Sequence, residues 1–300
     1  MLYYRRKILL ALLDVFGGAL TAKSLQKYLF LFTRGQDVKA FDFLPYYYGC
    51  FSFQANQDVI TLAKYGYLEV IEQETGRFIR LLQKQNYSSM LDLFDNQLLF
   101  DIKSRFGEMS QTELIRYTYI NYPFFAIRSS IASKILSEEE LLKVKAQERK
   151  INEAQLFTIG YEGLSLEKYI VSLILKDIRV LCDVRKNAYS QKYGFSKSQL
   201  QKACEGVGIY YIHIPELGIE SEFRQNLRSQ KDYDLLFDNY EKTTLQKQGE
   251  SLMKIKCLVE KYGRVALTCF EKNPLQCHRS RVAKYVMLLP NVEFKLTNIL

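Results

Sequence analysis

The chain has 300 residues, of which 48% are hydrophobic and 25% are charged, and its formal net charge at pH 7 is +9. This length and composition allow a substantial buried core and favour a globular protein of two domains. No apolar stretch approaches the roughly 20 residues that a membrane-spanning helix requires, so we expect a soluble protein.

Two sequence features indicate in which cellular compartment the protein is expected. Arg5, Arg6 and Lys7 precede a short apolar run, as in a secretory signal peptide, but Asp14 interrupts that run and no small-residue cleavage site follows. The six cysteines are scattered without a Cys-x-x-Cys pair, which is typical of reduced thiols. We therefore expect a cytoplasmic protein without disulfides.

The positive charge is shared by both halves of the chain and forms no basic tail. A pI of about 9.0 is compatible with a nucleic-acid partner. Because a moderately basic balance is also common on ordinary solvated surfaces, both interpretations stay open.

Residues 1–136 are predicted to form a mainly helical domain. Helical periodicity begins at Tyr4, Thr21 is the expected cap of a second helix, and a third helix starts near Ser52. Three helices followed by a β-hairpin are typical of a winged helix, and a later helix capped by Ser110 with Glu113 is expected to pack against them. The predicted ranges are 4–16, 22–32 and 52–66 for the helices and 67–72 and 77–82 for the strands.

A winged helix commonly places one helix in a DNA groove, and basic residues near the predicted hairpin could contact phosphates. The third helix also carries Asp58, so its exposed face would be weakly basic. Basic residues on a hairpin can instead protect a sheet edge from pairing, which leaves a protein partner or a structural role open. The basic residues are Lys64, Arg77, Arg80 and Lys84.

The segment Phe43–Ser52 reads Phe-Leu-Pro-Tyr-Tyr-Tyr-Gly-Cys-Phe-Ser and lies between the segments 23–30 and 62–68. Together, over about residues 5–82, these segments resemble the Panacea or SocA-like domain of antitoxin and phage-associated proteins. That family typically has a proline where Cys50 stands here. The resemblance implies a regulatory context, whereas the tyrosines are expected to pack in the core and the turn.

Residues 137–154 are predicted to form a charged helical linker. Ser137 as N-cap and Glu140 at the third helical position match the capping-box pattern. We expect the domain boundary here, because the pattern changes from mostly helical before this segment to alternating strands and helices after it.

Residues 155–300 are predicted to form an α/β domain. Alternating strands and helices indicate a doubly wound, mostly parallel, Rossmann-like sheet with helices on both faces. A capping box of Ser196 with Gln199 is expected at one helix. The predicted strands are 156–160, 178–183, 209–215, 264–270 and 292–296, and the predicted helices are 166–175, 196–206, 233–261 and 280–289.

Four strands end in polar or glycine-rich sequence. The carboxyl ends of parallel strands line one crevice in open α/β sheets, so we expect these residues to gather at one site. Both histidines of the chain, His213 and His278, lie beside two of these ends. The four ends are Gly160–Gly163, Asp183–Arg185, His213–Glu216 and Cys269–Glu271.

Five ordered motifs lie within residues 155–300, namely Thr158–Gly163, Asp183–Arg185, Phe195–Lys197, Ile214–Gly218 and Cys269–Ser280. Together they resemble the family called domain of unknown function 488 (DUF488). The repeated acids and cysteines and the Cys277-His278-Arg279 element imply enzymatic chemistry, but the resemblance implies no particular reaction. Together with a winged-helix-like front half, it implies a nucleic-acid or mobile-element context.

Glu271 and Asp183 are the candidate general acid and base, because two carboxylates at neighbouring strand ends can divide these roles. With Glu162 or Glu216 they could instead hold Mg²⁺. A further alternative is that neighbouring arginines neutralise them.

His278 and Arg279 begin the last major helix, where free N–H groups favour an anion. We expect a phosphate-binding corner there, aided by Arg185. Alternatively, His278 caps the helix and Arg279 pairs with Glu271 or Asp183.

Cys277 at the helix start could be a nucleophile, whereas Cys269 ends a buried strand, where cysteine most often fills apolar space. Zinc is not expected, because His213, Cys269, Cys277 and His278 follow no standard ligand spacing. In addition, the neighbours 277 and 278 are not expected to reach one ion.

No cofactor is expected, because Gly160-Tyr-Glu-Gly163 lacks the dinucleotide fingerprint and the P-loop lysine. The expected catalytic groups are Glu271, Asp183, Cys269 and His278. The expected substrate contacts are Gly160, Tyr161, Glu162, Arg185, His213, Glu216, Cys277 and Arg279.

Two functions follow from these residues. In the first, the α/β half is an enzyme acting on a nucleotide, a nucleic acid or another phosphate-bearing substrate, and the winged-helix-like half targets it. In the second, the protein is a non-catalytic DNA-binding or antitoxin-like regulator whose crevice binds a ligand. Both require Arg279, whereas only the first requires Glu271 and Asp183 to transfer protons.

Overall fold

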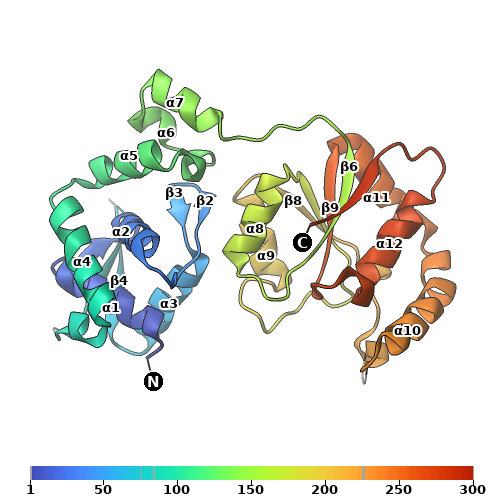
Figure 1. The fold of residues 1–300 in the computed structure, drawn as a ribbon, viewed down its shortest axis with the longest axis horizontal. Helices are drawn as coiled ribbons and strands as arrows, with labels where there is room; N and C mark the ends of the chain where they lie inside the picture. The colour runs from blue at the N-terminus through green and yellow to red at the C-terminus, as the bar shows by residue number, and fades with distance from the viewer. Residues whose placement is uncertain (1, 75, 84, 225–226, 300) are drawn as a thin grey trace. The chain divides into compact units, whose positions relative to one another are not determined.

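The computed structural model describes residues 2–74, 76–83, 85–224 and 227–299 (Figure 1). Contacts divide the chain into two units, residues 1–148 and 149–300. Helix α7 (Glu138–Lys145), which was expected in a linker, packs inside the first unit, where Val144 joins a small cluster with Ile115 and Leu136. No helix in the described residues has both the length and the apolar character that a bilayer span requires.

The three helices predicted at the start of the first unit are confirmed. They are α1 (Tyr4–Val15), α2 (Ala22–Gly35) and α3 (Phe53–Lys64). The Thr21 hydroxyl caps α2 and the Ser52 hydroxyl caps α3 by accepting hydrogen bonds from backbone N–H groups of the first turn. Their apolar faces form one core with the segments that follow.

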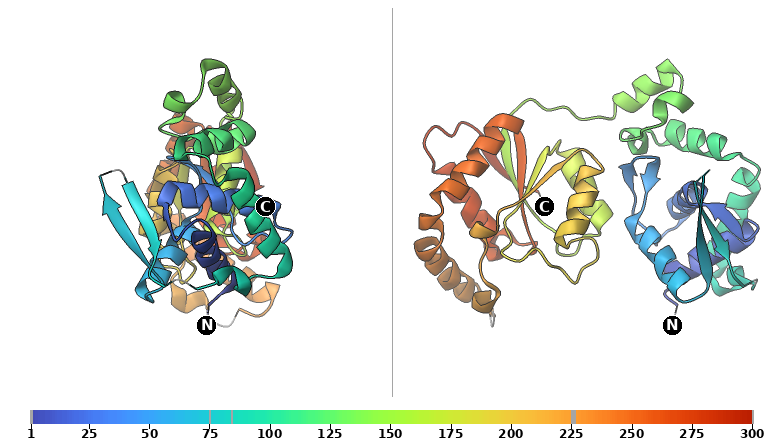
Figure 2. Two further views of the ribbon diagram at one scale, coloured as in Figure 1. Left: turned by 90° about the vertical axis from the view of Figure 1, so that its left-hand side faces the viewer. Right: turned by 180° about the vertical axis from the view of Figure 1, so that it is seen from behind.

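The predicted hairpin is also confirmed, as β4 (Leu68–Gln73) and β5 (Gly76–Leu81). The sequence patterns missed β1 (Ala19–Thr21), which adds to β5 and gives an antiparallel sheet in the order β1-β5-β4. The hairpin extends away from the helices (Figure 2). Lys84, one of its predicted phosphate contacts, lies outside the described residues.

The tyrosine-rich segment forms a second, two-stranded hairpin of β2 (Leu44–Tyr46) and β3 (Gly49–Phe51). Gly49 has a φ of +89°, which favours glycine, and a Cβ atom there would lie 2.4 Å from the Tyr119 ring. The turn therefore requires glycine for both its backbone conformation and its packing.

The rest of the first unit is helical. The capping boxes predicted at Ser110 with Glu113 and at Ser137 with Glu140 are confirmed at the starts of α5 and α7. The remaining elements are η1 (Tyr87–Met90), α4 (Leu93–Phe106), α5 (Gln111–Asn121), η2 (Pro123–Ala126) and α6 (Ala132–Ile135).

The second unit contains a five-stranded sheet in which every pair of neighbours is parallel. The order is β10-β6-β9-β7-β8, so the chain moves outward from β6 to β8 and then returns through β9 to the opposite edge. The strands are β6 (Gln155–Gly160), β7 (Val180–Asp183), β8 (Tyr210–His213), β9 (Arg264–Cys269) and β10 (Lys295–Ile299).

Helices cover both faces of this sheet, so the doubly wound arrangement is confirmed. Helices α8 (Leu166–Leu175) and α9 (Lys197–Glu205) lie on one face, and α11 (Gly249–Tyr262) and α12 (His278–Met287) lie on the other (Figures 1 and 2). Alternate residues along each strand enter the two apolar layers, and Val265, for example, joins the core beneath α11 and α12.

Three local predictions in the second unit are wrong. The last strand was predicted over 292–296 but is β10 (Lys295–Ile299). The region 233–261 is not one long helix but α10 (Gln230–Thr243) and α11, separated by a 3-10 turn, η5 (Leu245–Lys247). Ser196 makes no capping hydrogen bond to α9, because its hydroxyl accepts from the Ser190 N–H and donates to the Ser190 carbonyl, and Gln199 accepts from the Gly194 N–H. The other short helical turns are η3 (Pro215–Leu217), η4 (Ser221–Arg224) and η6 (Pro274–Gln276).

Candidate functional site

A hollow of about 710 Å³ lies at the carboxyl ends of the central strands. Loops that follow four strands contribute to it, as the topology of an open parallel sheet predicts. Its lining consists of Tyr161 after β6, Arg185–Asn187 and Tyr189–Lys192 after β7, Ile219 after β8, and Phe270 and Glu271 after β9.

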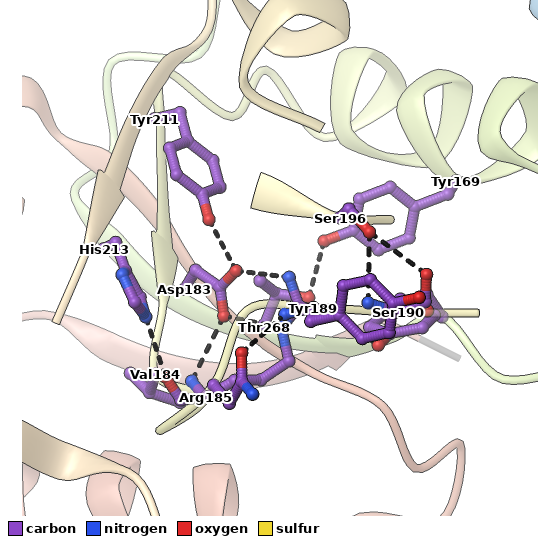
Figure 3. Close-up of polar contacts among 12 residues, drawn as sticks. Tyr169, Asp183, Val184, Arg185, Tyr189, Ser190, Ser196, Tyr211, His213 and Thr268 are labelled. Carbon is purple, nitrogen blue, oxygen red and sulfur yellow. Dashed lines mark hydrogen bonds and ion pairs between the residues drawn. The ribbon is translucent and has the colours of Figure 1, made fainter. Parts of the chain in front are cut away.

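Asp183 and Arg185 form a buried ion pair at this hollow (Figure 3). Asp183 is 0% exposed and Arg185 is 4% exposed. The Arg185 Nε lies 2.8 Å from one Asp183 carboxylate oxygen and its Nη2 lies 2.5 Å from the other. Tyr211 donates to the same carboxylate at 2.6 Å, and the remaining Nη of Arg185 donates to the Tyr161 hydroxyl at 2.7 Å. The carboxylate is therefore enclosed by donors.

These contacts fix the charge states around the pair. Burial alone would lower the pKa of Arg185, but the hydrogen bonds and the charge of Asp183 outweigh it and raise that pKa. Burial and the Asp183 charge together raise the pKa of Tyr211, which keeps the hydroxyl a donor. The geometry supports the alternative in which Arg185 neutralises Asp183 rather than a proton-transferring Asp183.

A second group of side chains lies at the end of β9. The Cys269 Sγ lies 3.2 Å from the Glu271 Oε2 and 3.6 Å from the His278 Nδ1. The His278 Nε2 lies 2.8 Å from the Val184 carbonyl. Because a carbonyl can only accept, Nε2 carries the hydrogen, and in the neutral ring Nδ1 presents its lone pair to the thiol.

Cys277 completes this group. Burial, together with the neighbouring Cys269, raises the pKa of the Cys277 thiol well above its ordinary value. The Sγ atoms of both cysteines and a His278 ring nitrogen lie within 4.8 Å of one another, and all three residues are buried. Although Cys277 and His278 are sequence neighbours and were not expected to share an ion, their ligand atoms lie close to each other and to the Cys269 Sγ.

Arg279 is also buried, with 1% of its surface exposed. Its Nη1 donates to the Glu271 carbonyl, and its Nη2 lies 3.2 Å from the Lys272 carbonyl. The guanidinium thus holds the main chain of the loop after β9. In this arrangement its contacts differ from both expected roles, the phosphate corner and the ion pair with Glu271 or Asp183.

A comparison with known families gives one match. Residues 165–286 match the family model Domain of unknown function DUF488. The resemblance predicted for the second half is thereby confirmed over the matched residues, which include Asp183, Arg185 and the segment Cys269–Arg279. No curated protein matches the chain. The match lies inside the second unit, so the resemblance of the first unit to Panacea or SocA-like domains stays a prediction.

Two residues that precede the DUF488 match position its last motif. A Cβ atom on Gly160 would lie 1.9 Å from the Glu271 carbonyl oxygen, so only glycine permits this close approach of β6 to the loop after β9. The Glu162 Oε2 accepts a hydrogen bond from the Lys272 N–H at 2.9 Å. Both were expected to contact substrate, but their observed contacts are to the main chain that carries Glu271.

The remaining predicted contacts divide between the hollow and its surroundings. Tyr161 lines the hollow and stacks on Phe195 with ring centroids 4.2 Å apart. The His213 Nε2 lies 2.8 Å from the Arg185 carbonyl. Glu216 is exposed and lines a different hollow of about 410 Å³, so it is not brought together with Glu271.

Sequence reasoning missed most of the polar lining. Lys186, Asn187 and the segment Tyr189–Lys192 occupy the long connection between β7 and α9. A connection of this length without regular structure is often functional, and this was the available signal. Phe270 was passed over because an aromatic residue next to a buried strand usually belongs to the core.

We predict that Asp183→Asn strongly destabilises the second unit. The substitution removes the negative charge and leaves Arg185 buried beside a neutral partner, which should cost about 3–5 kcal/mol of unfolding free energy in urea denaturation. Asp234→Asn is the matched control, because Asp234 is half exposed and lies 3.9 Å from Arg281. Equal losses in the two variants would contradict the buried-pair assignment.

We predict that Arg279→Ala lowers stability by about 2–3 kcal/mol, because the buried guanidinium is lost and the Glu271 and Lys272 carbonyls lose a charged donor. Urea denaturation measures the loss. Lys284→Ala, an exposed position on the same helix, should leave the midpoint unchanged. An Arg279→Ala variant as stable as the original chain, with weaker binding of phosphate ligands, would instead favour the phosphate corner.

Proposed function

We propose that the second unit is an enzyme that acts on a phosphate-bearing substrate, a nucleotide or a nucleic acid, bound in the hollow. The main support is the combination of cations, exposed aromatic rings and one carboxylate around a single cavity at the carboxyl edge of a parallel sheet.

Two lysines supply the positive charge that a phosphate requires. The Lys192 Nζ lies 3.1 Å from the Tyr161 carbonyl, and the Lys186 Nζ lies 2.8 Å from the Glu220 carboxylate. Burial lowers the pKa of Lys192, and the charge of Glu162 acts in the opposite direction. Both side chains come from the loop after β7 and keep N–H donors for a ligand.

Two aromatic residues supply surfaces on which a base could stack. Tyr189 is 72% exposed and Phe270 is 41% exposed, although both line the hollow. Exposed rings beside cations are the arrangement that single-stranded nucleic acids and nucleotides use in binding sites. This feature favours a nucleotide over inorganic phosphate.

Glu271 supplies the acid or base. It is the only carboxylate among the described residues that line the hollow. The Cys269 Sγ lies 3.2 Å from its Oε2. The loop that carries Glu271 is held by Gly160, Glu162 and Arg279, so its main chain is fixed before substrate binds. A positioned carboxylate of this kind can transfer a proton to or from substrate.

We predict that Glu271→Gln lowers the turnover of a nucleotide or oligonucleotide substrate by about 10²–10⁴-fold, with little change in its dissociation constant. Incubation of the full chain with nucleotides and short oligonucleotides, followed by chromatography and mass spectrometry of the products, measures turnover. Glu205→Gln, an exposed glutamate on α9, is the control. Equal turnover rates in the two variants would contradict the proposed role of Glu271.

The alternative function, a regulator that binds a ligand without turnover, has one observation in its favour. The second carboxylate expected to take part, Asp183, is enclosed by Arg185 and Tyr211. Under this alternative a nucleotide binds, no product forms, and Glu271→Gln changes affinity alone.

We further propose that the first unit is a winged-helix-like module that targets the second to nucleic acid. The order of α1, β1, α2 and α3, followed by the β4–β5 hairpin, supports this proposal. Lys64 is exposed at the end of α3. Arg77 lies opposite Glu72 and Arg80 opposite Glu69 on the hairpin, so a phosphate has to compete with a carboxylate for each arginine.

We predict that replacing Lys64, Arg77 and Arg80 together by alanine reduces the salt dependence of DNA binding by the full chain. Each lost phosphate contact lowers the slope of log affinity against log salt by about 0.9. Fluorescence anisotropy with a labelled duplex at several salt concentrations measures it. Arg116→Ala, whose side chain pairs with Glu140, is the control. An unchanged slope would remove DNA as the partner of this surface.

A further inference from the structure

We propose that Cys269, Cys277 and His278 form a binding site for one zinc-class divalent cation. Neither the DUF488 match nor the proposed reaction assigns such a site, and the proposal does not depend on the identity of the substrate. It rests on where the fold places three metal-binding side chains and on how the histidine is oriented.

The fold brings the three ligands together from two elements. Cys269 is the last residue of β9, while Cys277 is the N-cap of α12 and His278 its first helical residue. Cys277 has an extended backbone, with φ −134° and ψ 132°, whereas His278 already belongs to the helix. Because of this change of backbone conformation, the ligand atoms of these two sequence neighbours lie close to each other and to the Cys269 Sγ.

The distances fit a tetrahedral ion. Zinc–sulfur bonds of ~2.3 Å and zinc–nitrogen bonds of ~2.0–2.1 Å place a sulfur and a nitrogen ligand about 3.6 Å apart at a tetrahedral angle. The Cys269 Sγ and His278 Nδ1 are 3.6 Å apart, and all three ligand atoms lie within 4.8 Å of one another. Only small side-chain movements are needed for a single ion to reach all three.

The orientation of His278 matches that of a metal-binding histidine. Such residues usually donate one ring N–H to a carbonyl or a carboxylate, which fixes the tautomer and directs the other nitrogen to the metal. The His278 Nε2 donates to the Val184 carbonyl at 2.8 Å, and Nδ1 is left to face Cys269.

Charge balance also favours a divalent ion. Binding removes the proton from each of the two thiols, and two thiolates with a neutral imidazole then cancel the charge of an M²⁺ ion. The filled site would thus place no net charge among residues that are 0%, 0% and 1% exposed. Two thiolates and an imidazole favour zinc over magnesium or calcium.

Glu271 indicates where the fourth coordination position lies. Its Oε2 is 3.2 Å from the Cys269 Sγ, and the residue lines the hollow. The fourth ligand is therefore a water or substrate atom that enters from the hollow beside this carboxylate. Three protein ligands with an exchangeable fourth are typical of catalytic rather than structural zinc.

The direct test uses the full chain, purified under reducing conditions, dialysed against Zn²⁺ and then freed of unbound metal. We expect one zinc per chain by elemental analysis, and X-ray absorption should show two sulfur neighbours at ~2.3 Å in a four-coordinate shell. Zinc that dialyses away, or that is retained with only nitrogen and oxygen neighbours, would overturn the proposal.

Variants locate the ion, with Co²⁺ as a coloured probe. The original chain should show a thiolate-to-cobalt charge-transfer band, and Cys277→Ser should lose at least half of its intensity. The matched control is Cys257→Ser, an exposed cysteine on α11. Full intensity in Cys277→Ser, or no band in the original chain, would refute the site.

Two further measurements separate the outcomes. A circular-dichroism spectrum of Cys277→Ser that matches the original excludes unfolding as the cause of the lost band. If the variant does not fold, the X-ray absorption spectrum of the original chain alone decides whether the two cysteines bind the metal. Retained zinc with no turnover would support the metal site and contradict the proposed enzyme, whereas turnover without zinc would do the reverse.

Discussion

The buried ion pair of Asp183 and Arg185 is the constraint on which the rest of the site depends. It closes the end of β7 and fixes the backbone of residues 183–185 through hydrogen bonds to side chain and main chain. The Val184 carbonyl then receives the Nε2 of His278, and the Arg185 carbonyl lies against the Nε2 of His213. Both histidines of the chain are thus positioned by the strand that this pair anchors.

In this site, the residues that hold the loops in place are buried, and the residues that could contact a ligand line the hollow above them. Buried groups such as Arg279 and Gly160 hold the loop after β9, and their partners are main-chain atoms. The groups that line the hollow, including Glu271 and Lys192, come from the loops above them. The polar groups nearest the sheet are rigid scaffold, and a ligand would meet the layer above. The side chains of Cys269, Cys277 and His278 belong to the buried layer, and the Cys269 Sγ contacts Glu271 of the layer above.

The sequence predicted what depends on local pattern. Periodicity located most of the helices and strands, and short-range capping found Ser110 and Ser137, because these signals act within a few residues. The cap predicted at Ser196 is absent because the main chain of Ser190, six residues earlier, forms hydrogen bonds with the Ser196 hydroxyl. The break between α10 and α11 was missed because both helices continue the same amphipathic pattern around it.

The site itself was only partly predictable. The gathering of strand ends followed from parallel topology, which is why Glu271 and Tyr161 were found at the hollow. The partners of Arg279 and the convergence of Cys277 with His278 depend on the path of one loop and on one extended residue. Spacing rules carry no information about either, so the role of Arg279 was left open between an anion site and an ion pair, and a shared metal ion was not expected.

The orientation of His278 tests this account most directly, because it connects the ion pair to the cysteines. Long-range ¹H–¹⁵N correlation spectra of the histidine rings measure the tautomer, and with two histidines in the chain a His213→Gln variant completes the assignment. We predict a single tautomer for His278 at neutral pH, protonated at Nε2, in the original chain and loss of that preference in Asp183→Asn. A ring protonated at Nδ1, or a tautomer unaffected by Asp183→Asn, would contradict the account.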